Sequence, residues 1–220
     1  MKVIGFDPSL TAFGWVLHDT DGVGPTRCLA RGRFKTSAKT LYIARYMDMR
    51  SRVLALVEQT GVKDIGLEFP VFKDLWSEGM YGLFLYVSEA LYEAKTNVVF
   101  FSPNQVKAHA RLFLKRPQGW KMMKPDMVEA TMVDVGGGKR WNHNEADAYW
   151  VAKTAGRFWM LQNGVIREQD LTEPESKQFM EIHTYSRGKH AGETVEKGIL
   201  FREDERFFRW EQETCDGKEE

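Results

Sequence analysis

Long apolar runs are missing from the sequence, and none approaches the roughly 20 residues that a membrane-spanning helix needs. Cysteine is scarce as well: Cys28 and Cys215 lie far apart, without the spacing of a metal-binding pair. Such usage favours a reducing compartment. A strand-like run begins almost at Met1, where a signal peptide would need a longer apolar segment. We therefore expect a cytoplasmic protein with no membrane association.

Net charge is also missing, because 31 Lys and Arg balance 31 Asp and Glu in 220 residues. The two ends of the chain differ, however. Residues 161–220 hold 9 basic and 15 acidic residues, which leaves 22 basic and 16 acidic residues for 1–160. The length suits one sizeable core with an appendage. We expect a basic domain at 1–161, suited to polyanions, and an acidic extension at 162–220 whose structure the sequence does not predict.

The order of apolar patterns predicts an α/β fold. Short apolar or alternating runs favour strands at 2–7, 13–18, about 27–34, 64–68 and 97–101. Helical spacing and capping residues predict helices at about 37–61, 77–95, 102–114, 121–134 and 142–161. Three antiparallel strands followed by alternating helices and strands predict a mixed five-stranded sheet flanked by helices.

Three carboxylates occupy informative positions in this pattern. Asp7 and Glu68 end strand-like runs, and Asp147 lies in the first turns of the last helix. Each has a simple alternative on its own: a turn cap, a solvated strand end, or an acid near a helix N-terminus. Together they suit a hard divalent cation with oxygen ligands. Two such ions about 4 Å apart can activate water and stabilise the leaving oxygen in phosphodiester hydrolysis.

His143 and Asn144 precede Asp147 by four and three residues and share its face of the predicted helix. The unperturbed pKa of histidine is near neutrality, so His143 could activate water or protonate a leaving group. The alternative is a histidine that caps the helix or packs in the core.

Acidic residues are absent from 94–125, whereas basic residues are frequent there. The segment contains Lys95, Lys107, Arg111, Lys115, Arg116, Lys121 and Lys124. The spacing of Lys107, Arg111 and Lys115 predicts one basic stripe on a helix. Such like charges repel by a few tenths of a kcal/mol per pair. Release of counterions from a phosphate backbone would offset this repulsion. A solvated helix face is the alternative.

The segments VIGFDPSLTAFGWVL, IGLEFPVF, SPNQVKAHA, KPDMVEATM and HNEADAYWVA resemble, in this order, the motifs of the RuvC family of Holliday-junction resolvases. The resemblance runs from residue 2 to about residue 160. Ser9 departs from the usual glycine of the first motif, and Asn144 stands where the family has its fourth acidic residue. Residues 162–220 have no counterpart in the bacterial resolvases, which favours a bacteriophage or other viral version acting in the host cytoplasm.

The resemblance implies an RNase H-like fold. It also implies a homodimeric endonuclease of DNA recombination and repair that makes paired nicks in four-way DNA junctions. It implies Mg²⁺, replaceable by Mn²⁺, with two ions per active site. Asp7, Glu68 and Asp147 take the roles of metal ligands, and either Asn144 or His143 fills the fourth position. Lys107 and Lys124 are expected near the scissile phosphate, as parts of a DNA-binding surface with Arg111, Lys115, Arg116 and Lys121.

The resemblance also assigns roles to two other segments. An aromatic residue of the loop after Glu68, by position Phe72, would enter the junction and unstack bases. In the alternative, the loop aromatics Phe69, Phe72 and Trp76 simply cover the sheet. The helix at about 75–95 is apolar over more than one stripe, which predicts a dimer interface in addition to core packing.

Three other functions are compatible with parts of the pattern. The same chemistry could act on flaps, forks or RNA–DNA hybrids, because substrate choice lies in loops. An ATPase of the actin and sugar-kinase type would need a second phosphate loop and a Gly-rich adenosine motif. Neither occurs in the sequence, so we expect no nucleotide cofactor. A non-catalytic junction-binding protein would not need Glu68 and Asp147 in addition to Asp7.

Overall fold

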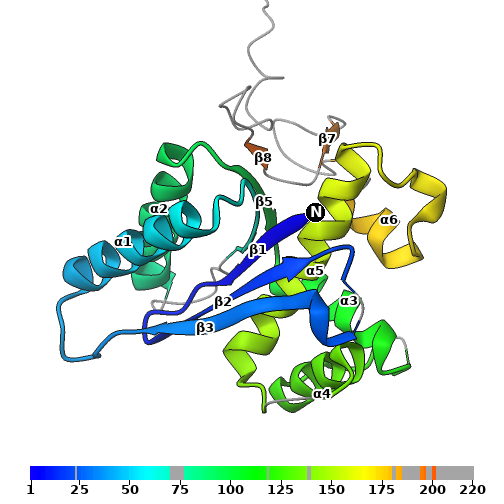
Figure 1. Ribbon diagram of the computed structural model, residues 1–220, viewed down its shortest axis with the longest axis horizontal. Helices are drawn as coiled ribbons and strands as arrows, with labels where there is room; N and C mark the ends of the chain where they lie inside the picture. Colours follow the sequence, from blue (N-terminus) through cyan, green and yellow to red (C-terminus); the bar gives the residue numbers. More distant parts are fainter. Residues whose placement is uncertain are drawn as a thin grey trace, which may run out of the picture.

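The computed structural model describes residues 1–22, 24–69, 77–117, 119–137, 140–179, 182–184, 194–196 and 200–201. One twisted sheet lies between two layers of helices (Figure 1), which confirms the predicted α/β class. No helix in these described ranges is both long and apolar enough to cross a bilayer.

The sheet contains the five predicted strands. These are β1 (Lys2–Asp7), β2 (Ala12–Asp19), β3 (Cys28–Lys35), β4 (Asp64–Glu68) and β5 (Asn97–Phe101). Their order is β3-β2-β1-β4-β5; β1 pairs antiparallel with β2 and parallel with β4. A two-residue strand of the extension, β8 (Leu200–Phe201), adds to the edge of β5. Because β1, β4 and β5 are parallel, their carboxyl ends meet at one edge of the sheet.

The helices follow their predicted positions closely. They are α1 (Tyr42–Thr60), α2 (Ser77–Glu93), α3 (Pro103–Phe113), α4 (Lys124–Val135) and α5 (His143–Gln162). The extension adds α6 (Glu173–Phe179) and the strand pair β6 (Ile182–Thr184) and β7 (Thr194–Glu196). Short 3-10 turns occur at η1 (Gly24–Arg27) and η2 (Glu168–Asp170).

Capping residues account for the helix ends that the sequence predicted correctly. The Ser102 hydroxyl accepts a hydrogen bond from the Gln105 amide, and the Gln105 side chain accepts one from the Ser102 amide in return. Gly61 ends α1 with a φ of 64°. The helix predicted to begin at about residue 37 begins instead at Tyr42, so Ser37 does not cap it. The Ser37 hydroxyl instead accepts a hydrogen bond from the Lys39 amide in a preceding turn.

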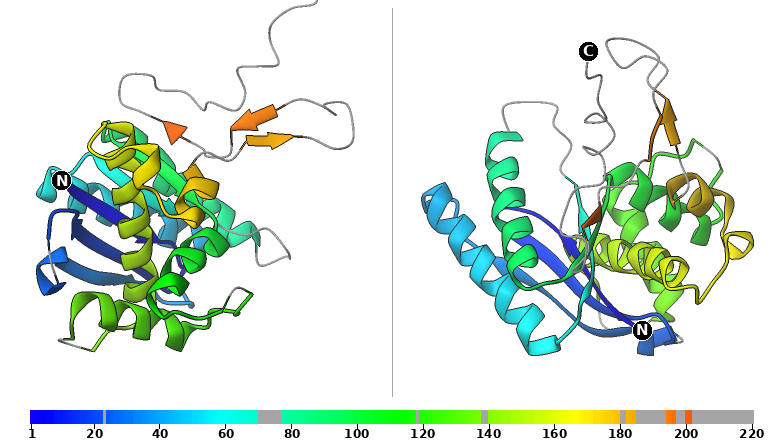
Figure 2. Two further views of the ribbon diagram at one scale, coloured as in Figure 1. Left: turned by 90° about the vertical axis from the view of Figure 1, so that its right-hand side faces the viewer. Right: turned by 90° about the horizontal axis from the view of Figure 1, so that it is seen from above.

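Side chains alternate between the two faces of the sheet and form two apolar cores. Figure 2 shows α1 and α2 over one face and α3, α4 and α5 over the other. The core under α1 and α2 includes the strand residues Ile4, Phe6, Phe13, Ile65, Leu67, Val98 and Phe100. The core under α5 includes the strand residues Val3, Val16, Val99 and Phe101. The sheet is therefore covered by packed helices on both faces.

Close contact between α5 and the sheet depends on glycine. A Cβ atom at Gly5 would lie 2.3 Å from both the carbonyl oxygen of Ala148 and the amide nitrogen of Ala152. A Cβ atom at Gly14 would lie 2.1 Å from the carbonyl oxygen of Asn144. The first half of α5 therefore lies directly on β1 and β2, close to the end of β1.

Replacing Gly5 by Ala should lower the free energy of unfolding by about 3 kcal/mol or more, because two backbone atoms of α5 would have to move. Denaturant titration measures this effect. The matched control is G79A in α2, where the new methyl group would meet no backbone atom of another element, only the side chains of Leu10, at 3.0 Å, and Tyr42, at 3.5 Å. Since alanine is the better helix former, this variant should be as stable as the parent or more stable. Equal effects of the two substitutions would contradict the close approach.

Candidate active site

The sheet brings two of the predicted carboxylates together. Asp7 is the last residue of β1 and Glu68 the last of β4, and the two strands are parallel neighbours with Phe6 opposite Leu67. Asp7 also pairs with Gly14 of β2, the residue that Asn144 covers at the start of α5. Asp147 lies nearly one turn further along α5. The predicted convergence of β1, β4 and the last helix is therefore present in the structure.

Electrostatic coupling shows that the three side chains share one environment. Burial, and then the charges of Glu68 and Asp147, raise the pKa of Asp7 well above its ordinary value. Burial and the Asp147 charge raise the pKa of Glu68 to about 8. Burial also raises the pKa of Asp147 to about 6, although Lys107 and Lys124 oppose the shift. Burial and mutual repulsion therefore both favour the protonated forms of these carboxyl groups.

No described residue donates a hydrogen bond to Asp7, Glu68 or Asp147, and none forms an ion pair with them. Partly buried carboxylates without donors, repelling one another, are the oxygen ligands that Mg²⁺ prefers. Within the described ranges, however, no three His, Cys, Asp or Glu side chains surround a common point at the spacing of metal ligands. The residue types therefore fit a divalent cation, and their side chains must turn toward one another to share it.

His143 and Asn144 have different surroundings from the carboxylates. Burial and the charges of Lys124 and Arg33 lower the pKa of His143, and none of the three carboxylates contributes to that shift. The Asn144 side chain is buried and its amide nitrogen donates a 2.6 Å hydrogen bond to the carbonyl oxygen of Ala12. Only Oδ1 of Asn144 thus remains for a metal ion, and the assignment of the fourth position remains a prediction.

Two lysines approach the carboxylates from the helical layer. Lys107 of α3 lowers the pKa of all three carboxyl groups, and Lys124 at the start of α4 lowers the pKa of Asp7 and Asp147. The resemblance to the RuvC family predicted that these same two lysines lie near the scissile phosphate. An anionic cluster with cations on one side is the arrangement that a metal-bound phosphodiester requires.

The remaining predicted basic residues differ in their positions. Lys115 does not extend the stripe of Lys107 and Arg111, because α3 ends at Phe113 and Lys115 has a left-handed φ of 50°. That part of the prediction is wrong: the helix stops before its next turn. Lys121 is exposed in the segment before α4.

Arg116 is engaged within the protein. Its guanidinium lies 3.3 Å from a carboxylate oxygen of Glu129 and 5.2 Å from the centre of the Trp120 ring. A role in DNA binding would require Arg116 to exchange these contacts for a phosphate.

The loop after Glu68 is described only at its start. Phe69 packs against Phe84 and Phe100, with ring centres 5.0 and 6.5 Å apart, so this ring covers the sheet as the simpler alternative expected. Phe72 and Trp76 lie outside the described residues, and the proposed wedge at Phe72 stays a prediction.

The sequence-based interpretation overlooked two arginines on β3. Arg31 and Arg33 lie 3.5 and 3.6 Å from carboxylate oxygens of Glu145 in the first turn of α5. The guanidinium of Arg31 also stacks on Trp141, 3.7 Å from the ring centre. The available signal was their spacing of two residues, which places both side chains on one face of a strand. They link β3 to the start of the helix that carries Asp147.

No protein-family model and no curated protein sequence matches the chain. Solved structures do, among them two of a bacterial RuvC. Thermus thermophilus RuvC has a TM-score of 0.59 and 21% sequence identity, over 74% of this chain and 97% of that chain. T. thermophilus RuvC in complex with a Holliday junction substrate has a TM-score of 0.58 and 19% identity, over 74% of this chain and 96% of that chain. The chain has a RuvC-like fold.

This RuvC-like fold confirms the predicted mixed sheet with flanking helices, and it accounts for most of the chain. Both matched structures are bacterial and give no support to a viral origin. Asp7, Glu68 and Asp147 lie at the carboxyl edge of its central parallel strands, where α5 crosses them.

Proposed function

We propose that the protein is a structure-selective endonuclease that resolves four-way DNA junctions by paired, metal-dependent hydrolysis of phosphodiesters. The observation that carries the proposal is the convergence of Asp7, Glu68 and Asp147, with raised pKa values and without donors. The RuvC-like fold supports DNA as the substrate class, since one matched structure is a complex with a Holliday junction.

In the proposed mechanism the chain contributes charge and position. Asp7, Glu68 and Asp147 would hold two Mg²⁺ or Mn²⁺ ions, which supply Lewis acidity and an activated water when bound. Lys107 and Lys124 attract the phosphate and offset its charge. His143 lies beside Lys124 with a lowered pKa, so it is neutral at pH 7 and would accept a proton more readily than donate one.

A homodimer is part of the proposal, because a junction resolved by opposed nicks needs two active sites. The proposed interface would use the exposed residues of α2. Leu83, Phe84, Val87 and Leu91 pack in the protein's own core. Tyr81, Leu85 and Tyr92 are 48%, 47% and 45% exposed and would form the contact. Light scattering should give the mass of a dimer, and a strict monomer giving single nicks would leave a nuclease but reject paired resolution.

The deciding experiment compares cleavage of a four-way junction with that of flap, fork and RNA–DNA hybrid substrates of matched sequence. The junction should be cut in two strands of like polarity with Mg²⁺ or Mn²⁺. Ca²⁺, with its looser coordination, should support binding but little turnover. Full activity in excess chelator would reject the metal mechanism, and preferred cleavage of another substrate would replace the junction in the proposal.

The basic face of α3 gives a separate prediction about DNA binding. Changing Lys107 and Arg111 to Ala should weaken binding to all DNA and reduce the slope of log K against log salt by about 0.9 for each lost phosphate contact. The control is K115A, because Lys115 lies beyond the helix end. If K115A changed the slope as much as the helical variants, position on α3 would not determine phosphate contact.

A further inference from the structure

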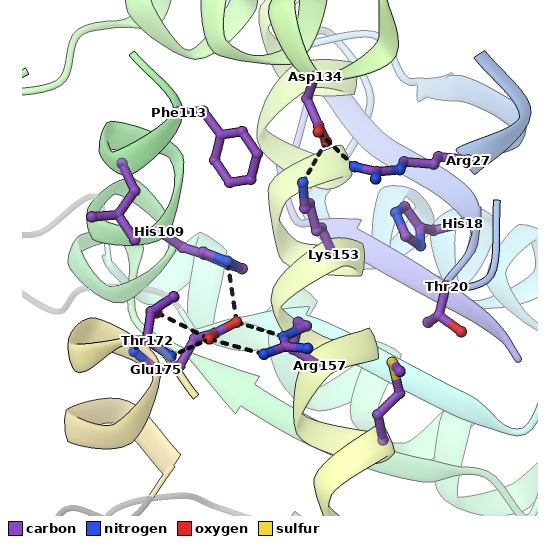
Figure 3. A pocket seen from close by; sticks show the side chains of 12 residues that line it. His18, Thr20, Arg27, His109, Phe113, Asp134, Lys153, Arg157, Thr172 and Glu175 are labelled. Carbon is purple, nitrogen blue, oxygen red and sulfur yellow. Dashed lines mark hydrogen bonds and ion pairs between the residues drawn. The ribbon is translucent and has the colours of Figure 1, made fainter. Parts of the chain in front are cut away.

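A cavity of about 530 Å³ lies between β2, α3, α5 and the start of the extension (Figure 3). Its wall includes His18, which pairs with Val3 near the start of β1, at the opposite end of that strand from Asp7. The cavity is therefore separate from the carboxylate cluster. Its charged lining consists of Arg27, Asp134, Lys153, Arg157 and Glu175.

Both carboxylates of this cavity are already engaged in its wall. Asp134 accepts hydrogen bonds from Arg27 at 2.6 Å and from Tyr149 and Lys153 at 2.5 Å each. Figure 3 shows this group and a second one around Glu175 on the other side of the cavity.

The Glu175 side chain is only 2% exposed. It accepts hydrogen bonds from the Arg157 guanidinium, at 2.8 Å from Nε, and from the amide and hydroxyl of Thr172, at 2.8 and 2.9 Å. Nε2 of His109 lies 3.4 Å from a carboxylate oxygen of Glu175. Asp134 and Glu175 therefore use their oxygens for hydrogen bonds within the cavity wall. The other polar groups that line the cavity are mainly hydrogen-bond donors.

His18 is the clearest of these donors. The residue is 4% exposed, and neither ring nitrogen has a hydrogen-bond partner among the described residues. Burying such a group without a partner is unfavourable. In Figure 3 its ring extends from β2 toward Lys153 of α5. A bound acceptor would satisfy the ring N–H and so reduce this penalty.

Cationic donors surround the histidine. Lys153 donates to Asp134, and its ammonium otherwise lies 3.7 Å from the centre of the Phe113 ring, so it retains hydrogens for a ligand. Arg157 uses Nε and Nη2 in the wall, and its Nη1 makes no hydrogen bond with the described part of the chain. Three cations face two carboxylates around the cavity, which leaves one positive charge in excess.

The titration of His18 agrees with this positive environment. Burial lowers the pKa of His18 to about 4, and the charges of Lys153 and Arg27 add to that effect while Asp134 opposes it. The ring is therefore neutral at pH 7, with one N–H to donate.

We propose that this cavity binds a small phosphate group, free or carried by a nucleotide, through His18, Lys153 and Arg157. A phosphate offers only acceptors and negative charge, which matches a site rich in donors with one unbalanced cation. Phe113 and Leu112 add apolar wall on which a base could rest. Such a ligand would act at a distance from the carboxylate cluster, as a regulator or stabiliser and not as a catalytic cofactor.

Calorimetric titration of the full chain tests this site without DNA, so the result is independent of the proposed nuclease function. Inorganic phosphate and AMP are titrated separately, at constant ionic strength and in excess chelator to keep metal from the carboxylates. Saturable binding of one phosphate per chain is expected. AMP binding at least about tenfold tighter would identify a nucleotide as the source, and equal affinities would identify free phosphate.

Three variants decide whether the cavity is responsible. H18L removes the donor and should weaken phosphate binding at least about tenfold, the loss expected for a hydrogen bond to a charged group. It should not lower the melting temperature without phosphate, because His18 has no hydrogen-bond partner among the described residues to lose and leucine can keep the packing against Tyr149. H18Q keeps an N–H donor and should retain most of the affinity. R52Q removes a cation from α1, on the other face of the sheet, and should bind as the parent does. Absence of saturable binding, or equal affinity in H18L and the parent, would overturn the proposal.

Discussion

Replacing Asp7, Glu68 or Asp147 by the matching amide should reduce junction cleavage by at least about 1,000-fold, equivalent to some 4 kcal/mol of transition-state stabilisation. Each carboxylate would contribute a charged ligand to the metal ions, and an amide keeps the shape but not the charge. DNA binding should stay the same or become tighter, because repulsion of the phosphate is reduced. Single-turnover cleavage and filter binding separate the two effects.

The matched control is D64N, at the other end of the strand that carries Glu68. Asp64 accepts a 2.9 Å hydrogen bond from Asn97 and does not belong to the carboxylate cluster. This variant should cut at a rate close to that of the parent. Parental rates in all three site variants would show that the cluster is not the active site, and a loss in D64N alone would point to the opposite end of the sheet.

The metal-free protein should lose stability as the pH rises from about 6.5 to about 8, by about 2 kcal/mol at most for Glu68. In the folded state the pKa of Glu68 is about 8, and the pKa of Asp7 is raised in the same direction. The unfolded chain has already released the Glu68 proton, so the folded state binds more protons in this window. Raising the pH therefore favours unfolding. Urea titrations at the two pH values measure the change.

Other titrating groups oppose this trend only in part. His18 and His109 have pKa values lowered to about 4, so most of their opposing effect arises below pH 6.5, and it is complete by about pH 7.5, where unfolded histidines are neutral. Lys153, with a pKa lowered to about 8, affects stability mainly at higher pH. E68Q and D7N should reduce the pH dependence and be more stable than the parent near pH 8. Added Mg²⁺ should stabilise the parent at that pH but not these variants. A flat or rising stability in the parent would contradict the raised pKa values.

The sequence predicted correctly those strands and helix ends that depend on neighbouring residues in the chain. The run from Val3 to Asp7 is apolar and ends in a turn, and the capping box at Ser102 and Gln105 defines the start of α3. The same local reasoning failed for Lys115, because periodicity shows that a helix can continue but not where its last turn ends. It failed for Ser37, whose hydroxyl accepts a hydrogen bond in a turn before α1.

By itself, the sequence determined the strands and helices of residues 1–161 and which acids lie at one edge of the sheet, since these depend on residues close together in the chain. Only the tertiary structure decided that Lys107 acts on all three carboxyl groups, and that His18 lies buried without a hydrogen-bond partner among the described residues. It also placed the buried Glu175, from the acidic extension, in an ion pair with Arg157. The physical reason is that burial and Coulomb interactions depend on distances in space, which the packing of helices on the sheet sets and no local pattern encodes.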